Sequence, residues 1–141
     1  MNIKVQAKTE RIPQYQKPGD VGADLYADIE NRQKIFVGHR VLIPTGVRLE
    51  LPEGVMAVVH PRSGMAYRCG LVAVTGIIDT GYRGEIMVNM LNLGERVQYI
   101  EPGDRIAQLV FQPVIYAQFE QVDELSETER GDGGFGHTGV R

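Results

Sequence analysis

The sequence predicts an all-β fold, a sandwich or barrel built from many short strands. The 17 glycines and seven prolines of the 141-residue chain interrupt it at short intervals. The apolar or alternating runs between them are rich in Val, Ile, Tyr and Phe, which favour strands. No segment keeps the 3.6-residue apolar period of a long helix. Short strands separated by turn residues are typical of β-sandwiches and β-barrels.

The apolar runs mark the expected strands. They occupy residues 34–37, 41–43, 47–51, 55–60, 71–74, 85–91, 96–100 and 105–113. One helical turn is expected at residues 65–68, entered from Ser63 and ended by Gly70, because glycine suits the position after a helix. The segment 76–85 is predicted to form a hairpin, with Asp79 directly before its turn.

Composition and charge limit the classes of function. A hydrophobic fraction of 43% in 141 residues fits one ordinary globular domain. The formal net charge of -3 argues against general nucleic-acid binding, which needs a basic face, but leaves a small anionic ligand open. Cys69 is the only cysteine, no apolar signal core opens the chain, and no apolar run reaches about 18 residues. These features predict a cytoplasmic protein with no membrane span.

The composition changes towards the C-terminus. Residues 1–125 are expected to form the folded body, and residues 126–141 a flexible, Gly-rich arm. The arm has too little apolar surface to bury itself, but it carries Arg130, Thr138 and the ring of Phe135. Arginine presents a charged fork to phosphate, glycine backbone closes tightly around an anion, and the ring offers a flat apolar face. A ligand that combines a base with phosphates is therefore expected.

Two segments in the first half of the chain carry polar side chains in small or apolar surroundings. Asp24 lies among small and apolar neighbours, which fits a site residue or a structural aspartate in a turn. Arg62 and Ser63 precede the expected helical turn, where backbone N–H groups favour anions. A capped surface turn is an equal alternative for this second segment.

Two later segments have the same character. Asp79 follows two strand-forming residues and precedes a turn, a position suited to a general base or to a bond with its own turn backbone. Gln108 is expected to share one strand face with Ile106 and Val110. A polar group on an apolar face needs a partner, from the protein or from a ligand.

These four segments and the arm, in this order, resemble the five motifs of the homotrimeric dUTPase family, the dUTP pyrophosphatases. The resemblance covers residues 18–139, nearly the whole chain. It implies a jelly-roll β fold and a homotrimer with sites at the subunit interfaces, each closed by an arm. It also implies Mg²⁺-dependent hydrolysis of dUTP to dUMP and pyrophosphate, through attack of water on the α-phosphorus. Such an activity limits uracil incorporation into DNA and supplies dUMP for thymidylate synthesis.

The resemblance implies a role for each matching residue. Asp79 is expected to be the general base, and Tyr82 to pack beneath the deoxyribose and exclude a 2′-hydroxyl. Asp24 is expected to support the metal indirectly, through water, with Mg²⁺ held mainly by the substrate phosphates. The residues expected to bind the phosphates are Arg62, Ser63, Gly64, Gln108, Arg130, Gly136 and Thr138. The residues expected to contact the sugar or the base are Tyr82, Phe135, Gly76 and Ile78, with Phe135 stacked on uracil.

Two positions bear on recognition of the base. Many bacterial relatives carry an asparagine where this chain has Ala73, so backbone groups of a β-hairpin near residues 71–79 are expected to read uracil. dCTP deaminases and bifunctional deaminase–triphosphatases share the fold and carry a catalytic glutamate where this chain has Asn89. A carboxamide does not shuttle a proton at neutral pH, which disfavours this alternative. A regulatory binding protein on the same scaffold is the second alternative.

Overall fold

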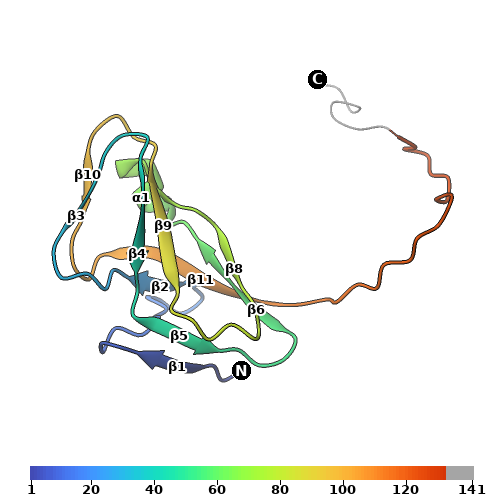
Figure 1. Cartoon of the computed structure of the whole chain (residues 1–141), viewed down its shortest axis with the longest axis horizontal. Coiled ribbons are helices and arrows are strands. Elements are labelled where there is room, and N and C mark those ends of the chain that lie inside the picture. Colours follow the sequence, from blue (N-terminus) through green and yellow to red (C-terminus); the bar gives the residue numbers. More distant parts are fainter. Residues whose placement is uncertain (133–141) are drawn as a thin grey trace.

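The computed structural model describes residues 1–132, which are built mainly of β-strands (Figure 1). The strands of the described part are β1 Lys4–Ala7, β2 Ala23–Tyr26, β3 Gln33–Ile35, β4 Arg40–Pro44, β5 Val47–Glu50, β6 Val55–His60, β7 Leu71–Ala73, β8 Gly76–Ile78, β9 Met87–Asn92, β10 Gln98–Ile100 and β11 Arg105–Pro113. They are accompanied within residues 1–132 by one helix, α1, which spans Ser63–Cys69. The predicted all-β class is therefore confirmed.

Helix α1 lies where the sequence indicated. It begins at Ser63 and is followed by Gly70, whose φ of 68° lies in the left-handed region that glycine adopts without steric cost. The Gly70 N–H donates a hydrogen bond to the Ala66 carbonyl at 3.0 Å. A side chain at position 70 would also collide with the backbone of Gly94. Glycine is thus required at this helix end by both its conformation and its surroundings.

Two strands were missed in the sequence analysis. Strand β1 contains one large apolar residue, Val5, and its one strand partner within residues 1–132 is β5, at an exposed edge. Strand β2 is interrupted by a charge, yet Ala23, Asp24 and Leu25 are all buried. The alternative that Asp24 lies in a turn is therefore wrong. Burial of a carboxylate within a strand requires partners for its charge, and no local sequence pattern identifies them.

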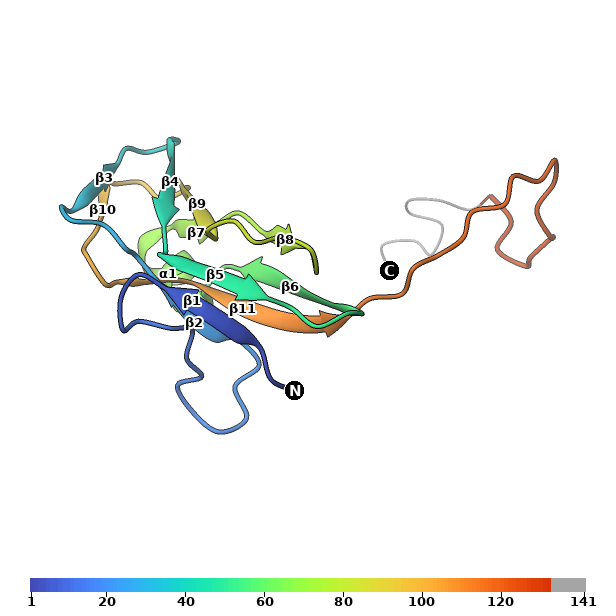
Figure 2. The ribbon, with the colours of Figure 1, turned by 60° about the horizontal axis from the view of Figure 1, so that its bottom comes forward.

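The strands form antiparallel sheets around one hydrophobic core (Figure 2). One sheet has the strand order β2-β11-β6-β8 and another the order β4-β9-β7, while β1 pairs with β5 and β10 with β3. The large apolar side chains buried most completely are Leu25, Ile35, Ile43, Val47, Ile86, Val88, Met90, Ile100, Ile106 and Leu109. Removing each such side chain from water contributes about 1.5–3 kcal/mol to folding. This arrangement is a jelly-roll-like β fold, as expected.

The register of the four-stranded sheet brings distant motifs together. Gln108 on β11 lies opposite Asp24 on β2 and opposite His60 on β6. The β11–β2 ladder is irregular between Arg105 and Ala107. Because of this irregularity, Ile106 belongs to the core and does not share the exposed side of Gln108, contrary to the sequence prediction.

The predicted hairpin at residues 76–85 is not formed. Strand β8 pairs with β6, whereas β9 pairs with β4 and β7 in another sheet. Residues 79–86 are instead a connection between the two sheets. The expected hairpin near residues 71–79 is absent as well, because β7 and β8 lie in different sheets. Apolar alternation marks strands but does not specify their partners, which explains both errors.

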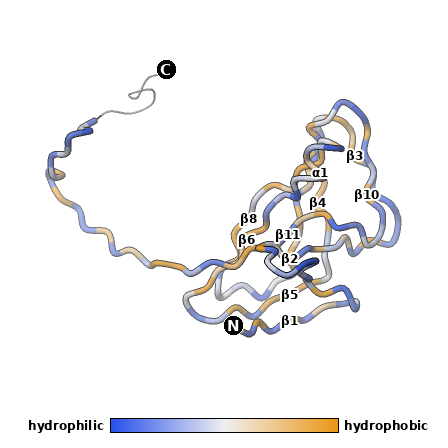
Figure 3. The backbone as a smooth tube through the Cα atoms, turned by 180° about the vertical axis from the view of Figure 1, so that it is seen from behind, coloured by the Kyte–Doolittle hydropathy of each residue, from blue (hydrophilic) through white to orange (hydrophobic). Residues whose placement is uncertain are grey.

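The segment after β11 leaves the body of the molecule (Figures 1 and 3). Residues 115–132 contain neither helix nor strand and are exposed throughout. Their large apolar side chains are exposed too, including Ile115 at 93% and Phe119 at 98%. The division into a body of residues 1–125 and an arm of residues 126–141 stays a prediction. No helix in residues 1–132 has the length and apolarity needed to cross a membrane.

Candidate active site

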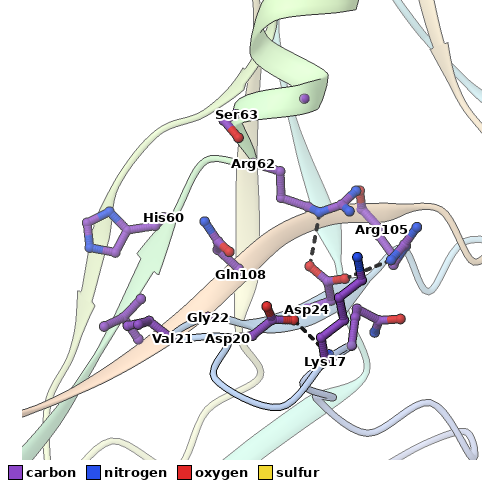
Figure 4. Close-up of a pocket in the computed structure, with 13 residues that line it drawn as sticks. Lys17, Asp20, Val21, Gly22, Asp24, His60, Arg62, Ser63, Arg105 and Gln108 are labelled. Atoms are coloured by element: carbon purple, nitrogen blue, oxygen red, sulfur yellow. Dashed lines mark hydrogen bonds and ion pairs between the residues drawn. The ribbon is translucent and has the colours of Figure 1, made fainter.

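A first pocket opens beside β2 and β11, and we call it the β2–β11 pocket (Figure 4). Its volume is about 580 Å³. It contains all five of the predicted phosphate or metal-supporting residues that precede the C-terminal segment, namely Asp24, Arg62, Ser63, Gly64 and Gln108. Strand pairing explains this convergence for Asp24 and Gln108, which lie opposite each other. The start of α1 supplies Ser63 and Gly64.

Two arginines converge on Asp24 in this pocket (Figure 4). Arg62 Nε lies 2.9 Å from Asp24 Oδ1, and Arg105 Nη1 lies 3.2 Å from Asp24 Oδ2. Arg62 also donates a hydrogen bond to the backbone carbonyl of Arg105 at 2.9 Å. Both carboxylate oxygens thus contact cations, and the side chain is only 6% exposed. Asp24 therefore orients the two guanidinium groups.

Gln108 is held in place beside these charges. Its Nε2 donates a hydrogen bond to the Pro61 carbonyl at 3.0 Å, so the partner that the sequence required is a backbone group. A Cβ at Gly22 would collide with the Gln108 side chain, and the glycine therefore leaves room for the amide. Val110 lines the same pocket, as expected from strand alternation.

The side chains of the β2–β11 pocket favour an anion. Lys17, Arg62 and Arg105 are cationic, whereas Asp20 and Asp24 are anionic. Within residues 1–132, no group of three or more His, Cys, Asp or Glu side chains is placed to hold a metal ion. The described part of the chain therefore offers a cationic cleft without a metal cage of its own.

A second pocket, which we call the β8–β9 pocket, has a volume of about 420 Å³. It contains the four other predicted residues of the body: Gly76, Ile78, Asp79 and Tyr82. Asp79 follows β8 directly, and its side chain is exposed. Its backbone carbonyl accepts a hydrogen bond from the Tyr82 N–H at 3.0 Å, but its carboxylate has no protein partner in the described part of the chain.

The aromatic ring in this pocket is fixed by its own loop. The Tyr82 hydroxyl donates a hydrogen bond to the Glu85 carbonyl at 3.0 Å. A Cβ at Gly84 would collide with the tip of the Tyr82 ring, so glycine at this position is needed for the ring to lie as it does. The side chain of Tyr82 remains accessible, since the residue is 43% exposed.

The loop that carries Asp79 and Tyr82 is fastened at both ends. The Thr80 hydroxyl donates to the Val55 carbonyl at 2.7 Å, and the Thr45 hydroxyl donates to the Ile86 carbonyl at 2.6 Å. These side-chain bonds link the loop to β6 at one end and to the connection between β4 and β5 at the other. The carboxylate of Asp79 is thereby presented from an anchored backbone.

Glu85 adds a third anchor to the loop. Its carboxylate accepts hydrogen bonds from Lys8 Nζ and from the Gly46 N–H, at 2.8 and 2.9 Å. The bond with Lys8 is the main reason that the pKa of Glu85 lies below its ordinary value, against the opposing effect of burial. Glu85 therefore stays ionised at neutral pH.

The two pockets share no lining residue. His60 lines the β2–β11 pocket, whereas its neighbour Val59 lines the β8–β9 pocket. Successive strand residues point to opposite faces of a sheet, so β6 separates the two pockets. The predicted site residues of the body therefore form two groups, which line separate pockets of one chain.

Some site residues were missed, and others lie outside the described part. Arg105 and Lys17 line the first pocket, and the signal for Arg105 was its position within the motif of Gln108. Lys17 lies in a loop with no periodic pattern to mark it. Arg130 lies in the exposed segment after β11 and lines neither pocket. The three remaining predicted residues, Phe135, Gly136 and Thr138, lie outside residues 1–132.

Comparisons with known proteins identify relatives of the chain. A family model described as dUTPase matches residues 8–139. The "Deoxyuridine 5'-triphosphate nucleotidohydrolase" of Chlamydia pneumoniae is 50% identical over 132 residues, which cover 92% of this chain and 91% of that protein. A protein of the same description from Streptomyces coelicolor is 52% identical over 131 residues, covering 91% of this chain and 70% of that protein.

Solved structures share the fold. The Staphylococcus bacteriophage 80alpha dUTPase with dUpNHpp matches with a TM-score of 0.90 at 29% identity, covering 99% of each chain. A mutant dUTPase from phage phi11 of S. aureus, described with a structural Mg(II) ion, matches with a TM-score of 0.81 at 24% identity. This second match covers 90% of the present chain and 100% of that one, and it bears on the fold alone.

Proposed function

The chain belongs to the dUTPase family and hydrolyses dUTP, and we propose that Asp79 is the general base of this reaction. The observation that carries the proposal is the exposed carboxylate of Asp79, which follows β8 and has no protein partner within residues 1–132. A carboxylate whose oxygens are free accepts a proton from water. The anchored loop beneath it supplies the positioning that such a step needs.

The proposed reaction is a single displacement at the α-phosphorus. Asp79 takes a proton from a water molecule, and the water oxygen bonds to the α-phosphorus of dUTP. The bond from the α-phosphorus to the bridging oxygen breaks, so that dUMP and pyrophosphate are the products. Positioning and charge stabilisation supply most of the acceleration, and no covalent enzyme intermediate is required.

The β2–β11 pocket is proposed to bind the triphosphate. Arg62 presents a guanidinium fork and Gln108 an amide, while Ser63 and Gly64 supply donors at the start of α1. Asp24 keeps Arg62 and Arg105 oriented, which is a positioning role. The anchored pairs prearrange cations for a ligand that carries several negative charges.

Mg²⁺ is proposed to bind with the substrate. Residues 1–132 hold no acidic cluster for a metal, and both oxygens of Asp24 face arginines. Mg²⁺ commonly keeps several waters and is bound through substrate phosphates, so the residues present fit a metal that arrives with dUTP. The ion neutralises charge on the phosphates when bound. Asp24 influences it only through water.

We propose that the working enzyme is a homotrimer, whose complete site joins the β2–β11 pocket of one chain to the β8–β9 pocket of another. The separation of the two pockets by β6 supports this proposal, because Arg62 and Asp79 of one chain line different pockets. Closed symmetry with a shared interface gives three equal sites. Tyr82, Gly76 and Ile78 then receive the sugar and the base.

The C-terminal arm, residues 126–141, is proposed to close over this shared site. Arg130 would bind the γ-phosphate, Gly136 and Thr138 would bind the phosphates, and Phe135 would stack on uracil. This proposal rests on the motif and on the exposed course of residues 115–132, which gives the chain reach beyond its own body. A cytoplasmic location is proposed too, supported by the free thiol of Cys69.

A mixing experiment tests the shared site. Two chains, Asp79→Asn and Arg62→Gln, are purified, shown to be folded and nearly inactive alone, then unfolded together and refolded in equal amounts. Random assembly places two intact pockets at about a quarter of the sites, so activity should recover to about one quarter of the wild-type value. Recovery of no activity would mean that each site lies within one chain. Sedimentation of the wild-type chain gives the number of subunits independently.

A further inference from the structure

The contact between β8 and β6 continues beyond the end of β8. The last backbone pair of the two strands joins Ile78 to Ala57. Continuing the same antiparallel register by two residues brings Thr80 opposite Val55. At this position the half-buried Thr80 hydroxyl donates a hydrogen bond to the Val55 carbonyl at 2.7 Å. A side chain therefore extends the ladder past Asp79, after the backbone pairing has ended.

The turn that follows β8 is closed mainly on itself. The Tyr82 N–H donates to the Asp79 carbonyl at 3.0 Å. The Arg83 guanidinium donates to the carbonyls of Thr80 and Tyr82 at 2.8 and 3.0 Å. These bonds fix the shape of the turn but not its place relative to the sheet. Within residues 1–132, the Thr80 hydroxyl makes the one hydrogen bond that joins residues 80–83 to a strand.

Asp79 is held through both of its neighbours in the chain. Ile78 pairs with β6 on one side, and Thr80 bonds to β6 on the other. Consecutive Cα atoms lie about 3.8 Å apart, so a residue between two fixed neighbours keeps little backbone freedom. A general base accepts a proton only from a water within hydrogen-bond distance. The place of the Asp79 carboxylate therefore depends on the attachment of Thr80.

Building on the proposed role of Asp79 as the general base, we propose that Thr80 is a positioning residue for the attack of water. Thr80 lines neither pocket, whereas Asp79 lines the β8–β9 pocket. Thr80 therefore acts through the backbone that it shares with Asp79, and its hydroxyl keeps the carboxylate at the distance that proton transfer needs. A displacement of about 1 Å slows a positioned reaction by up to about a hundredfold.

Substitution of Thr80 by valine and by serine tests this role. Valine keeps the branched shape but cannot donate to the Val55 carbonyl, whereas serine keeps the hydroxyl. In Thr80→Val, kcat for dUTP is expected to fall by about tenfold to a hundredfold. KM should change by less than about threefold, because the residues that line the pockets are unchanged. Thr80→Ser should keep kcat within about threefold of the wild-type value.

A double variant separates positioning of the base from a general loosening of the fold. Once Asp79→Asn has removed the carboxylate, no base is left for Thr80 to position. Adding Thr80→Val to Asp79→Asn should therefore leave the residual kcat unchanged, although the same substitution slows the wild-type chain. A structural defect would lower kcat in both backgrounds.

The controls separate this inference from the proposed function. Thr9→Val removes a hydroxyl at an exposed position outside both pockets and should leave kcat and KM unchanged. Urea unfolding and sedimentation establish that each variant is folded and assembled, and Thr80→Ala replaces Thr80→Val if the valine variant does not fold.

Three results would overturn the inference: a kcat within threefold of wild type in folded Thr80→Val, no recovery of kcat in Thr80→Ser, or a further loss in the double variant. If Asp79→Asn keeps the wild-type kcat, the proposed role of Asp79 fails. If Asp79→Asn loses kcat and Thr80→Val does not, the inference about Thr80 alone fails.

Discussion

The aspartates of the two pockets differ in their exposure and in their contacts. In the β2–β11 pocket, Asp24 is 4% exposed and each of its oxygens contacts an arginine. In the β8–β9 pocket, Asp79 is exposed and its carboxylate has no protein partner within residues 1–132. A carboxylate whose two oxygens contact cations orients those cations, whereas a carboxylate without a protein partner is open to water. The same residue type therefore has a different role in each pocket, because its surroundings in the fold differ.

The supporting structure differs in the same way. Asp24 lies within a strand of the four-stranded sheet, where pairing with β11 limits its movement. Asp79 lies at the start of a connection between two sheets, fastened by Thr80 and Thr45 at its ends. Substitutions in the β2–β11 pocket are therefore expected to lower mainly the stability of the fold and the binding of substrate. In the β8–β9 pocket, substitution of Asp79 is expected to lower mainly the rate of the chemical step.

The largest expected effect belongs to Asp79. In Asp79→Asn, kcat for dUTP should fall by about 10²–10⁴, the range that a general base contributes. KM and the free energy of unfolding should change little, because the carboxylate is exposed and unpartnered in the described part. Steady-state kinetics and urea unfolding measure these quantities, with Glu53→Gln in an exposed turn as the matched control. A kcat near the wild-type value would remove Asp79 as the base.

A stability effect is expected at Asp24. Asp24→Asn leaves Arg62 and Arg105 close together without their shared counter-charge. Since the carboxylate is buried but the arginines are 26% and 43% exposed, the loss should be about 2–3 kcal/mol of unfolding free energy. Urea denaturation measures it. Glu101→Gln, at a pair with Arg32 of 3.8 Å in which both side chains are over half exposed, should have no measurable effect. Equal effects for both variants would contradict the organising role of Asp24.

The smallest expected effect depends on pH and tests how the loop that carries Asp79 is anchored. The hydrogen bond from Lys8 lowers the pKa of Glu85, so the pair stabilises the fold above the ordinary pKa range of glutamate. This contribution is lost as pH falls through the lowered pKa, because the carboxyl is then protonated in the folded state as well. Lys8→Met should therefore cost about 0.5–1 kcal/mol at pH 7, since Lys8 is 59% exposed, and nothing in strong acid.

Urea unfolding at neutral and acid pH measures this difference. The matched control is Lys4→Met, because Lys4 and Glu50 form a pair of the same 2.8 Å length on the exposed surface. That variant is expected to cost less than Lys8→Met at pH 7, because Lys4 and Glu50 are more exposed than Lys8 and Glu85. A cost for Lys8→Met that stays the same in acid would show that its packing, and not its charge, supports the loop.

Much of the fold was predictable because strands and turns are encoded locally. The apolar run at residues 105–113 coincides with β11, and Gly70 ends α1 as expected. The partners of each strand were not predictable in the same way. The hairpin expected around Asp79 failed because β8 joins β6 through contacts distant in sequence. The sequence did not predict strand β2, because a charged residue such as Asp24 is atypical of a buried strand. The arginines that pair with Asp24 lie far from it in the sequence and are brought to it only by the fold.

By itself, the sequence determined the β class, the helix end at Gly70 and the set of residue types that handle a triphosphate. Those features depend on local conformation and on the chemistry of single side chains. Only the tertiary structure decided that Arg62 and Asp79 occupy different pockets. It also decided that Arg105 pairs with Asp24 in the first pocket and that Glu85 anchors the loop of the second. The physical reason is that register and sheet order arise from burial of the whole core, which no short segment contains.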